Sequence, residues 1–243
     1  MPERVATETD GLSVQMLRAR VVRVYPHDAK AWTQGLLWHD GWVYESTGLN
    51  GESSLRQVRL RDGEVELRVA LEDRLFGEGL ARVGQQLLQL TWRSGLGLRY
   101  ELDGFAPLEA FSYSGEGWGL CFDGRSVVRS DGTPQLYFHD PDTFEVQRAL
   151  NVEHLGEAVS NLNELECAKG WIYANVLNSD AILRVDPATG RVVAIVDASG
   201  LLSREEKAGA NVLNGIAYYP PGESFLLTGK FWPKLFEVVF VAE

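Results

Sequence analysis

The sequence is poor in the residues that build metal sites and membrane spans. It has two cysteines and four histidines among 243 residues. Two cysteines cannot form a disulfide framework, and Cys121 and Cys167 lack metal-ligand spacing. We interpret them as two small buried thiols, with a single bridge as the open alternative. No apolar run is long enough to cross a bilayer, so the sequence predicts no membrane-spanning segment.

Positive charge is also scarce. The chain has 23 Lys and Arg against 34 Asp and Glu, a formal net charge of −11. Nucleic acids and anionic membranes would be repelled, so neither is an expected partner, and the expected substrate is neutral or cationic. The first ten residues have neither a basic start nor an apolar core, which predicts no signal peptide in this chain. Localisation stays open: cytoplasmic, or secreted or periplasmic if a leader was removed.

A strand-rich pattern recurs five times along the chain. In each unit a polar residue precedes a short strand, a glycine-bearing turn and a second strand. The spacing between units is roughly 40 to 50 residues, which is typical of propeller blades. The polar residues that lead the five units are Gln34, Glu78, Glu116, Asn163 and Asn214.

Further hairpins give each unit four strands. Asp62-Gly63 and the turn from Asp186 to Gly190 each separate two β-rich runs. The sequence therefore predicts an all-β, five-bladed β-propeller as a single domain over 13–243, after a polar tail 1–12. The last unit is one strand short, and we expect the strand near Leu17–Val24 to complete it and close the ring. The sequence predicts a short inserted helix from Leu201 to Lys207, in which Ser203-Arg204-Glu205-Glu206 supplies an N-terminal signal.

The repeat predicts where the polar residues meet. In an antiparallel hairpin the start of the first strand lies beside the end of the second. Gln34 should then face Glu45, Glu78 should face Trp92, and Asn214 should face Lys230. If these hairpins are innermost, the pairs converge on one mouth of the central channel. The four histidines (His27, His39, His139 and His154) fall in turns or at strand ends and are expected to be solvated, so a catalytic zinc is not expected.

Glu78 is the candidate proton-transfer group. It stands between Gly77 and Gly79, where the backbone can turn sharply and another molecule can approach. Aromatic surroundings would raise the pKa of this carboxyl group, whereas a nearby lysine would oppose the shift. Gln34 and Lys230 could donate hydrogen bonds to an oxyanion, which indicates proton transfer at an amide or ester carbonyl.

The structural alternatives for these residues stay open. A glutamate between glycines is an ordinary turn residue, and Trp92 and Trp118 could pack between blades. Asn163 and Asn214 could cap strand ends. Lys230 could form an ion pair with Glu45, Glu116 or Glu164. Glu45, Asp131 and Glu164 could support the site without touching substrate.

At these positions the sequence resembles the plant-type glutaminyl-peptide cyclotransferases, a family also found in bacteria. The similarity spans roughly residues 30 to 238 in the right order. Its main motifs are Thr33-Gln34-Gly35-Leu36, Phe76-Gly77-Glu78-Gly79-Leu80, Gly115-Glu116-Gly117-Trp118-Gly119-Leu120, Leu162-Asn163-Glu164-Leu165-Glu166, Leu213-Asn214-Gly215-Ile216 and Thr228-Gly229-Lys230-Phe231-Trp232-Pro233.

The resemblance implies a five-bladed propeller that converts N-terminal glutaminyl residues of peptides or proteins into pyroglutamyl residues and releases ammonia. It implies no cofactor for catalysis, and a structural divalent cation in the channel stays open. A monomer is expected. One departure is Leu177, which follows Ala174-Asn175-Val176 where relatives can carry an aromatic residue, so the preference for the residue after glutamine could differ. The expected catalytic residues are Glu78, Gln34 and Lys230, and the expected substrate-binding residues are Trp92, Trp118, Asn163, Glu45 and Asn214.

Two other functions remain as alternatives. The first is a divalent-cation-dependent, lactonase-like hydrolase in which Glu45, Glu116, Asp131 and Glu164 hold calcium. The second is a non-catalytic propeller that binds peptides or sugars, because fold does not fix function. Sensitivity to a chelator would favour the hydrolase, and chelator-insensitive ammonia release would favour cyclisation.

Overall fold

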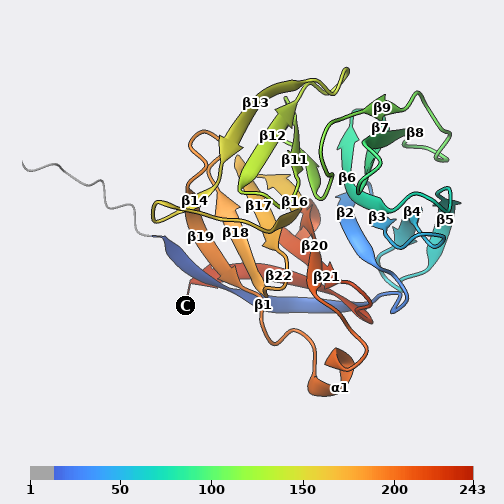
Figure 1. The fold of residues 1–243 in the computed structure, drawn as a ribbon. Coiled ribbons are helices and arrows are strands. Elements are labelled where there is room, and N and C mark those ends of the chain that lie inside the picture. Colours follow the sequence, from blue (N-terminus) through green and yellow to red (C-terminus); the bar gives the residue numbers. More distant parts are fainter. Residues whose placement is uncertain (1–13, 243) are drawn as a thin grey trace, which may run out of the picture.

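The protein folds almost entirely into strands (Figure 1). This computed structural model describes residues 14–242, so the predicted tail 1–12 lies outside the described residues. The α-helix found in this part of the chain, α1 (Arg204–Lys207), has four residues. No helix within 14–242 is long and apolar enough to cross a membrane. The prediction of an all-β fold is confirmed.

Three sheets of four strands follow one another along the chain. In each sheet, strands that are neighbours in space are consecutive in sequence. Tight turns make this possible: Asp40 and Gly41 have φ angles of 47° and 87° between the first two strands, as a type I′ hairpin turn requires. The strands are β2 (Thr33–His39), β3 (Trp42–Thr47), β4 (Ser54–Arg59) and β5 (Val65–Ala70); β6 (Gly77–Val83), β7 (Gln86–Thr91), β8 (Leu96–Glu101) and β9 (Phe111–Ser112); β10 (Leu120–Phe122), β11 (Val127–Ser130), β12 (Gln135–His139) and β13 (Val146–Asn151).

The remaining long strands form one sheet of eight. Its spatial order is β16-β17-β18-β19-β1-β22-β21-β20. The first strand of the chain pairs antiparallel with the last, as the sequence predicts. It also pairs in parallel with β19, through Gln15 opposite Ala194, which the sequence does not predict. The strands are β1 (Gln15–Pro26), β16 (Leu162–Ala168), β17 (Trp171–Val176), β18 (Ala181–Val185), β19 (Val192–Asp197), β20 (Leu213–Tyr219), β21 (Ser224–Gly229) and β22 (Lys234–Ala242).

The short elements lie in the connections. Strands β14 (Glu153–His154) and β15 (Glu157–Ala158) form a two-stranded sheet, and a 3₁₀ turn covers Pro220–Gly222. The predicted helix exists but starts later than Leu201. Ser203 is its N-cap and forms a capping box with Glu206, because each side chain accepts from the other residue's backbone N–H.

Five strands from the four large sheets contact one another in a closed order. β2 contacts β6 and β20, β6 contacts β10, β10 contacts β16, and β16 contacts β20. Glycines allow this approach: a Cβ added to Gly35 would lie 2.5 Å from the backbone nitrogen of Leu80. Likewise, a Cβ on Gly79 would lie 2.5 Å from the backbone nitrogen of Leu120, and one on Gly119 would lie 2.0 Å from the backbone oxygen of Asn163. The inner strands therefore meet backbone against backbone around a common axis.

Cys121 and Cys167 are joined by a disulfide, so the interpretation as two free thiols is wrong. Their Cα atoms are 5.4 Å apart, within the range that a disulfide spans. Cys121 belongs to β10 and Cys167 to β16, two inner strands that are distant in sequence and adjacent in space. The sequence could not show this adjacency, because it depends on how the sheets are placed around the axis.

The core lies between neighbouring sheets. Leu37 and Leu55 from the first sheet pack with Leu80 and Leu87 from the second in one buried cluster. His139 is also fully buried, which corrects the expectation that it is solvated. Its ring stacks on Phe144 with centroids 4.1 Å apart, and burial lowers its pKa to about 4. His139 is therefore a neutral packing residue.

Candidate active site

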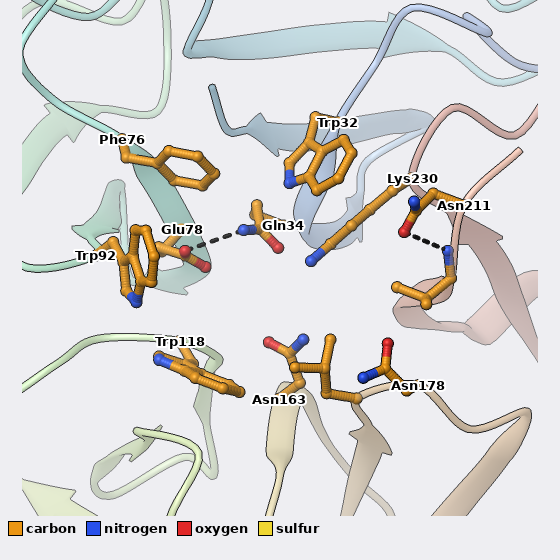
Figure 2. A pocket seen from close by; sticks show the side chains of 12 residues that line it. Trp32, Gln34, Phe76, Glu78, Trp92, Trp118, Asn163, Asn178, Asn211 and Lys230 are labelled. Carbon is orange, nitrogen blue, oxygen red and sulfur yellow. Dashed lines mark hydrogen bonds between the residues drawn. The ribbon is translucent and has the colours of Figure 1, made fainter. Parts of the chain in front are cut away.

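A cavity of about 380 Å³ opens at one end of the ring of inner strands (Figure 2). Six of the eight predicted site residues line it. The cavity is walled by aromatic and amide side chains around one carboxyl and one ammonium group. The lining residues are Trp32, Gln34, Phe76, Glu78, Trp92, Trp118, Asn163, Leu177, Asn178, Asn211, Val212 and Lys230.

β-Bulges present four of the polar side chains at this end. The inner hairpins change register between Thr33 and Gly35 and between Gly77 and Leu80, and again at 162–165 and 213–216. A bulge adds one residue to a strand and re-aims its side chain. Gln34, Glu78, Asn163 and Asn214 all lie within these bulges, as the polar residues that head the repeated motif.

Glu78 is buried, with 4% of its surface exposed. It accepts one hydrogen bond, from Gln34 Nε2 to Oε1 at 2.9 Å. Loss of hydration raises the pKa of Glu78 well above its ordinary value, and the negative charge of Glu116 adds to the shift. The Lys230 ammonium opposes it. Such a carboxyl group can both take and return a proton near neutral pH.

A chain of side-chain amides holds Gln34 in place. Asn214 Nδ2 donates to Gln34 Oε1 at 3.1 Å and to the Thr33 carbonyl oxygen at 2.9 Å. This fixes which end of the Gln34 amide faces Glu78. Asn214 does not line the cavity, so it acts on the site through Gln34.

Lys230 enters the cavity just after β21. Burial lowers the pKa of its ammonium group, while the charge of Glu78 works in the opposite direction. Within residues 14–242 Lys230 forms no ion pair, so the alternative of a partner in Glu45, Glu116 or Glu164 is not realised. Its nitrogen lies 5.2 Å from the centre of the Trp32 ring instead. The ammonium group is therefore available to a ligand.

Glu116 fixes two aromatic walls of the cavity. Its Oε2 accepts from Trp92 Nε1 at 2.7 Å and from Trp118 Nε1 at 2.9 Å. Arg93 donates to the other carboxylate oxygen at 2.9 Å and stacks 3.7 Å from the centre of the Trp92 ring. Phe76 packs against Trp92 with ring centroids 5.5 Å apart. These contacts shape an apolar slot beside Glu78.

Asn163 also lines the cavity and offers an acceptor. Its Oδ1 is buried, and no donor within 14–242 reaches it. A buried polar atom without a partner is unfavourable unless a ligand or water satisfies it. Asn163 is therefore suited to receive an N–H group of a bound molecule.

Glu45 lies outside the cavity lining, unlike the other carboxylate of the prediction. The two-residue turn at Asp40 and Gly41 sets the register of this hairpin, so Glu45 is opposite Leu36 and not Gln34. Its Oε1 accepts from Thr33 Oγ1 at 2.7 Å and contacts His27 Nε2 at 3.0 Å. His27 is thus buried rather than solvated, with 5% of its side chain exposed. These partners lower the pKa of Glu45 despite the opposing effect of burial.

Glu164 fills the axis of the ring. Glycine follows Gln34, Glu78, Trp118 and Asn214 at the ends of the inner strands, whereas Glu164 follows Asn163. Its two carboxylate oxygens accept from the backbone nitrogens of Leu36 at 3.1 Å and Ile216 at 2.8 Å. Burial raises the pKa of Glu164 well above its ordinary value.

The proposed calcium ligands do not come together. Glu45 pairs with His27, Glu116 holds the two indoles, and Glu164 binds backbone N–H groups. Asp131 accepts from the backbone of Thr133 at 3.0 Å. Within the described chain no three His, Cys, Asp or Glu side chains lie close enough to share a metal ion. The prediction that these four side chains hold calcium together is therefore wrong.

Five lining residues were not predicted as part of the site: Trp32, Phe76, Asn178, Asn211 and Val212. Trp32 directly precedes the Thr33-Gln34-Gly35 motif and Phe76 begins the Phe76-Gly77-Glu78 motif, so their positions were usable signals. The other three lie in connections outside the repeated motif. No local pattern places them at the mouth.

Comparison of the whole chain with known proteins shows its family. The model of the family described as Glutamine cyclotransferase matches residues 2–240. A glutaminyl-peptide cyclotransferase from Arabidopsis thaliana is 39% identical over 232 residues, covering 93% of this chain and 72% of the relative. The chain belongs to the glutamine cyclotransferase family.

Solved structures extend the comparison. The crystal structure of the Myxococcus xanthus glutaminyl cyclase is 42% identical, with a TM-score of 0.86 over 95% of this chain and 100% of that one. The Neurospora crassa Pan2 WD40 domain is similar in fold alone, at 9% identity and a TM-score of 0.52 over 85% of this chain and 74% of that one. WD40 repeats form β-propellers, so this likeness fits the ring of sheets. The family resemblance found in the sequence is confirmed.

Proposed function

We propose that the protein is a glutaminyl-peptide cyclotransferase, which converts N-terminal glutaminyl residues of peptides or proteins into pyroglutamyl residues and releases ammonia. The observation that carries this proposal is Glu78, a buried carboxyl group with a raised pKa in an aromatic cavity that also holds Lys230. Membership of the glutamine cyclotransferase family supports the same activity. The expected partners are therefore peptides that begin with glutamine.

The architecture that we propose is a five-bladed propeller. The eight-stranded sheet divides between β19 and β1 into two four-stranded units, which gives five units with the other three sheets. The closed order of contacts among β2, β6, β10, β16 and β20 supports this count. The parallel β1–β19 pairing then joins two blades at their outer edges.

The reaction uses Glu78 to move a proton. Glu78 accepts a proton from the substrate α-ammonium, whose ordinary pKa is about 7.7–8.0, and its own raised pKa eases that transfer. The freed amine attacks its own γ-carboxamide carbon. Glu78 returns the proton to the departing nitrogen, and ammonia leaves. The Glu78 carboxylate then accepts the second proton of the ring nitrogen as the lactam forms, and passes it to the released ammonia or to water. Because both reacting groups belong to one residue, the main task is orientation.

The other lining residues hold the substrate. Trp92 and Trp118 enclose the glutaminyl side chain and exclude water, and Asn163 Oδ1 accepts from a substrate N–H group. Gln34 orients the Glu78 carboxyl group, and Lys230 stabilises negative charge on the carbonyl oxygen. Catalysis in this scheme needs no cofactor. The protein acts as a monomer.

The direct test is mass spectrometry of a peptide that begins with glutamine. Wild-type protein should remove one ammonia per peptide, and a matched peptide that begins with asparagine serves as a specificity control. Adding a chelator should leave the rate unchanged, because the candidate calcium ligands lie apart. A peptide mass that stays constant with correctly folded protein would contradict the activity and favour the binding module.

A further inference from the structure

Four indole N–H groups lie at or beside the cavity, and three of them have acceptors within the protein. Trp92 and Trp118 donate to Glu116, and Trp232 donates to the Asn211 carbonyl oxygen at 2.9 Å. Trp32 Nε1 differs: it is buried, and no acceptor within residues 14–242 reaches it. Leaving a buried N–H without a partner is unfavourable, so an acceptor from a ligand is expected there.

The packing of Trp32 sets the direction of this N–H. Its ring meets Phe231 edge to face with centroids 5.0 Å apart. Its backbone carbonyl accepts from the Gly48 nitrogen at 2.8 Å, and a Cβ on Gly48 would lie only 2.9 Å from Trp32 Cδ1. Figure 2 shows the indole nitrogen turned toward the space between Gln34 and Lys230. The ring therefore has little freedom to turn its N–H elsewhere.

Beside amide side chains that can both donate and accept, the cavity holds groups of a single type. Trp32 and Lys230 are donors only, and they lie next to each other on one side. Glu78 and Asn163 Oδ1 are acceptors. A substrate that closes an N-terminal glutamine needs this arrangement, because its ammonium must face acceptors while its γ-carbonyl oxygen faces donors.

We infer that Trp32 is a catalytic residue whose Nε1–H, together with the Lys230 ammonium, binds the γ-carbonyl oxygen of the glutaminyl residue and stabilises the oxyanion. This assignment rests on the proposed function. The oxygen gains negative charge when the amine attacks, so the two hydrogen bonds strengthen in the transition state. The loss should consequently appear in kcat rather than in KM.

Trp32→Phe tests the role, since phenylalanine keeps an aromatic face for Phe231 and Lys230 and removes the N–H together with part of the indole ring. We expect kcat for a Gln-peptide to fall about 10- to 100-fold while KM changes by less than about threefold. Trp38→Phe is the matched control, because Trp38 packs on Tyr219 away from the cavity and should keep wild-type kinetics. The wild type must release ammonia in the same assay, so failure of the proposed function is seen separately.

Two results would overturn the assignment. An unchanged kcat in folded Trp32→Phe would remove Trp32 from catalysis, and a raised KM with unchanged kcat would show ground-state binding only. If Trp32→Phe does not fold, benzothienylalanine can replace Trp32, because sulfur takes the place of the N–H in a ring of the same shape. The same loss of kcat is expected, and wild-type kcat would again reject the role.

Discussion

Glu45 and Glu78 are both buried, yet their carboxyl groups behave in opposite ways. Glu45 has 2% of its surface exposed and Glu78 has 4%. The pKa of Glu45 is lowered, whereas that of Glu78 is raised well above its ordinary value. The amount of burial therefore does not explain the difference.

The partners of the two carboxylates explain it. Glu45 has His27 and Thr33 within hydrogen-bond distance, and Arg56 lies 3.8 Å away. Glu78 has one neutral donor, Gln34, and its Lys230 neighbour makes no ion pair with it. A carboxylate with several charged donors is stabilised as an anion, while one with few is destabilised. Glu45 is suited to holding structure, and Glu78 to exchanging a proton.

The largest expected effect is on turnover in Glu78→Gln. We expect kcat to fall about 10²- to 10⁴-fold, because the amide cannot take a proton. Stability should not suffer: the raised pKa means that the Glu78 contribution is present at low pH and is lost as pH rises through the folded pKa. Urea unfolding at pH 9 should give a free energy equal to or above that of wild type. Near-native turnover would remove Glu78 from the catalytic role.

Glu45→Gln should lower the stability of the protein and leave its turnover nearly unchanged, the reverse of Glu78→Gln. We expect the free energy of unfolding to fall by about 3 kcal/mol at pH 6, because the buried His27 loses its counter-charge. Turnover should stay within about threefold of wild type, since Glu45 does not line the cavity. Glu52→Gln, at an exposed position, is the control for both measurements. A loss of kcat with unchanged stability would contradict the structural role of Glu45 and indicate a role in catalysis.

The pH dependence of stability follows from the same pair. The pKa of Glu45 is lowered from 4.5, so its contribution is complete above that value and is lost as pH falls through the folded pKa. The pKa of His27 is raised from 6.5, so its contribution is complete below 6.5 and is lost as pH rises through the folded pKa. Tm of the wild type minus Tm of Glu45→Gln should therefore be largest between pH 4.5 and 6.5. A difference that is flat from pH 4 to pH 9 would refute the pairing.

The pH profile of kcat should be bell-shaped. The rate should rise as Glu78 loses its proton at its raised pKa, and fall as Lys230 loses its proton at its lowered pKa. Lys230→Arg should move the descending limb to higher pH, because a guanidinium keeps its charge. Initial rates across pH 5 to 10 measure both limbs. A descending limb that does not move in this variant would assign it to another group.

The smallest expected effect is that of Glu116→Gln. Its charge helps to raise the pKa of Glu78, so the ascending limb should move to lower pH, and only slightly because Glu116 is partly exposed and its charge is screened by solvent. KM should rise about two- to fivefold, since one amide oxygen replaces a carboxylate as the acceptor for two indoles. A shift to higher pH would contradict the charge coupling.

Local sequence determined much of the fold. Alternating apolar residues, Asp-Gly turns and the five-fold motif predicted the strands, the hairpins and the pairing of the first strand with the last. The motif also placed Gln34, Glu78, Trp92, Trp118, Asn163 and Lys230 at one mouth. These features rest on neighbouring residues and on period, so short-range patterns carry them.

Sequence reasoning failed for Glu45 because the register of the hairpin was misjudged. The two-residue turn at Asp40 and Gly41 pairs His39 with Trp42, and the same register pairs Leu36 with Glu45. Glu45 is therefore opposite a residue two positions farther along the strand than Gln34, and it contacts His27 instead of the cavity. The bulge lies beyond this pair, between Thr33 and Gly35, and glycine within a strand pattern is a local signal for it.

The sequence by itself determined the strands, their order and the carboxylate between two glycines. Only the tertiary structure decided that Cys121 meets Cys167, that β1 also pairs with β19, and that Trp32 Nε1 faces the cavity without an acceptor. It also decided the opposite pKa shifts of Glu45 and Glu78. The physical reason is that a pKa or an unmet hydrogen bond depends on groups from distant parts of the chain, which meet only when the ring closes.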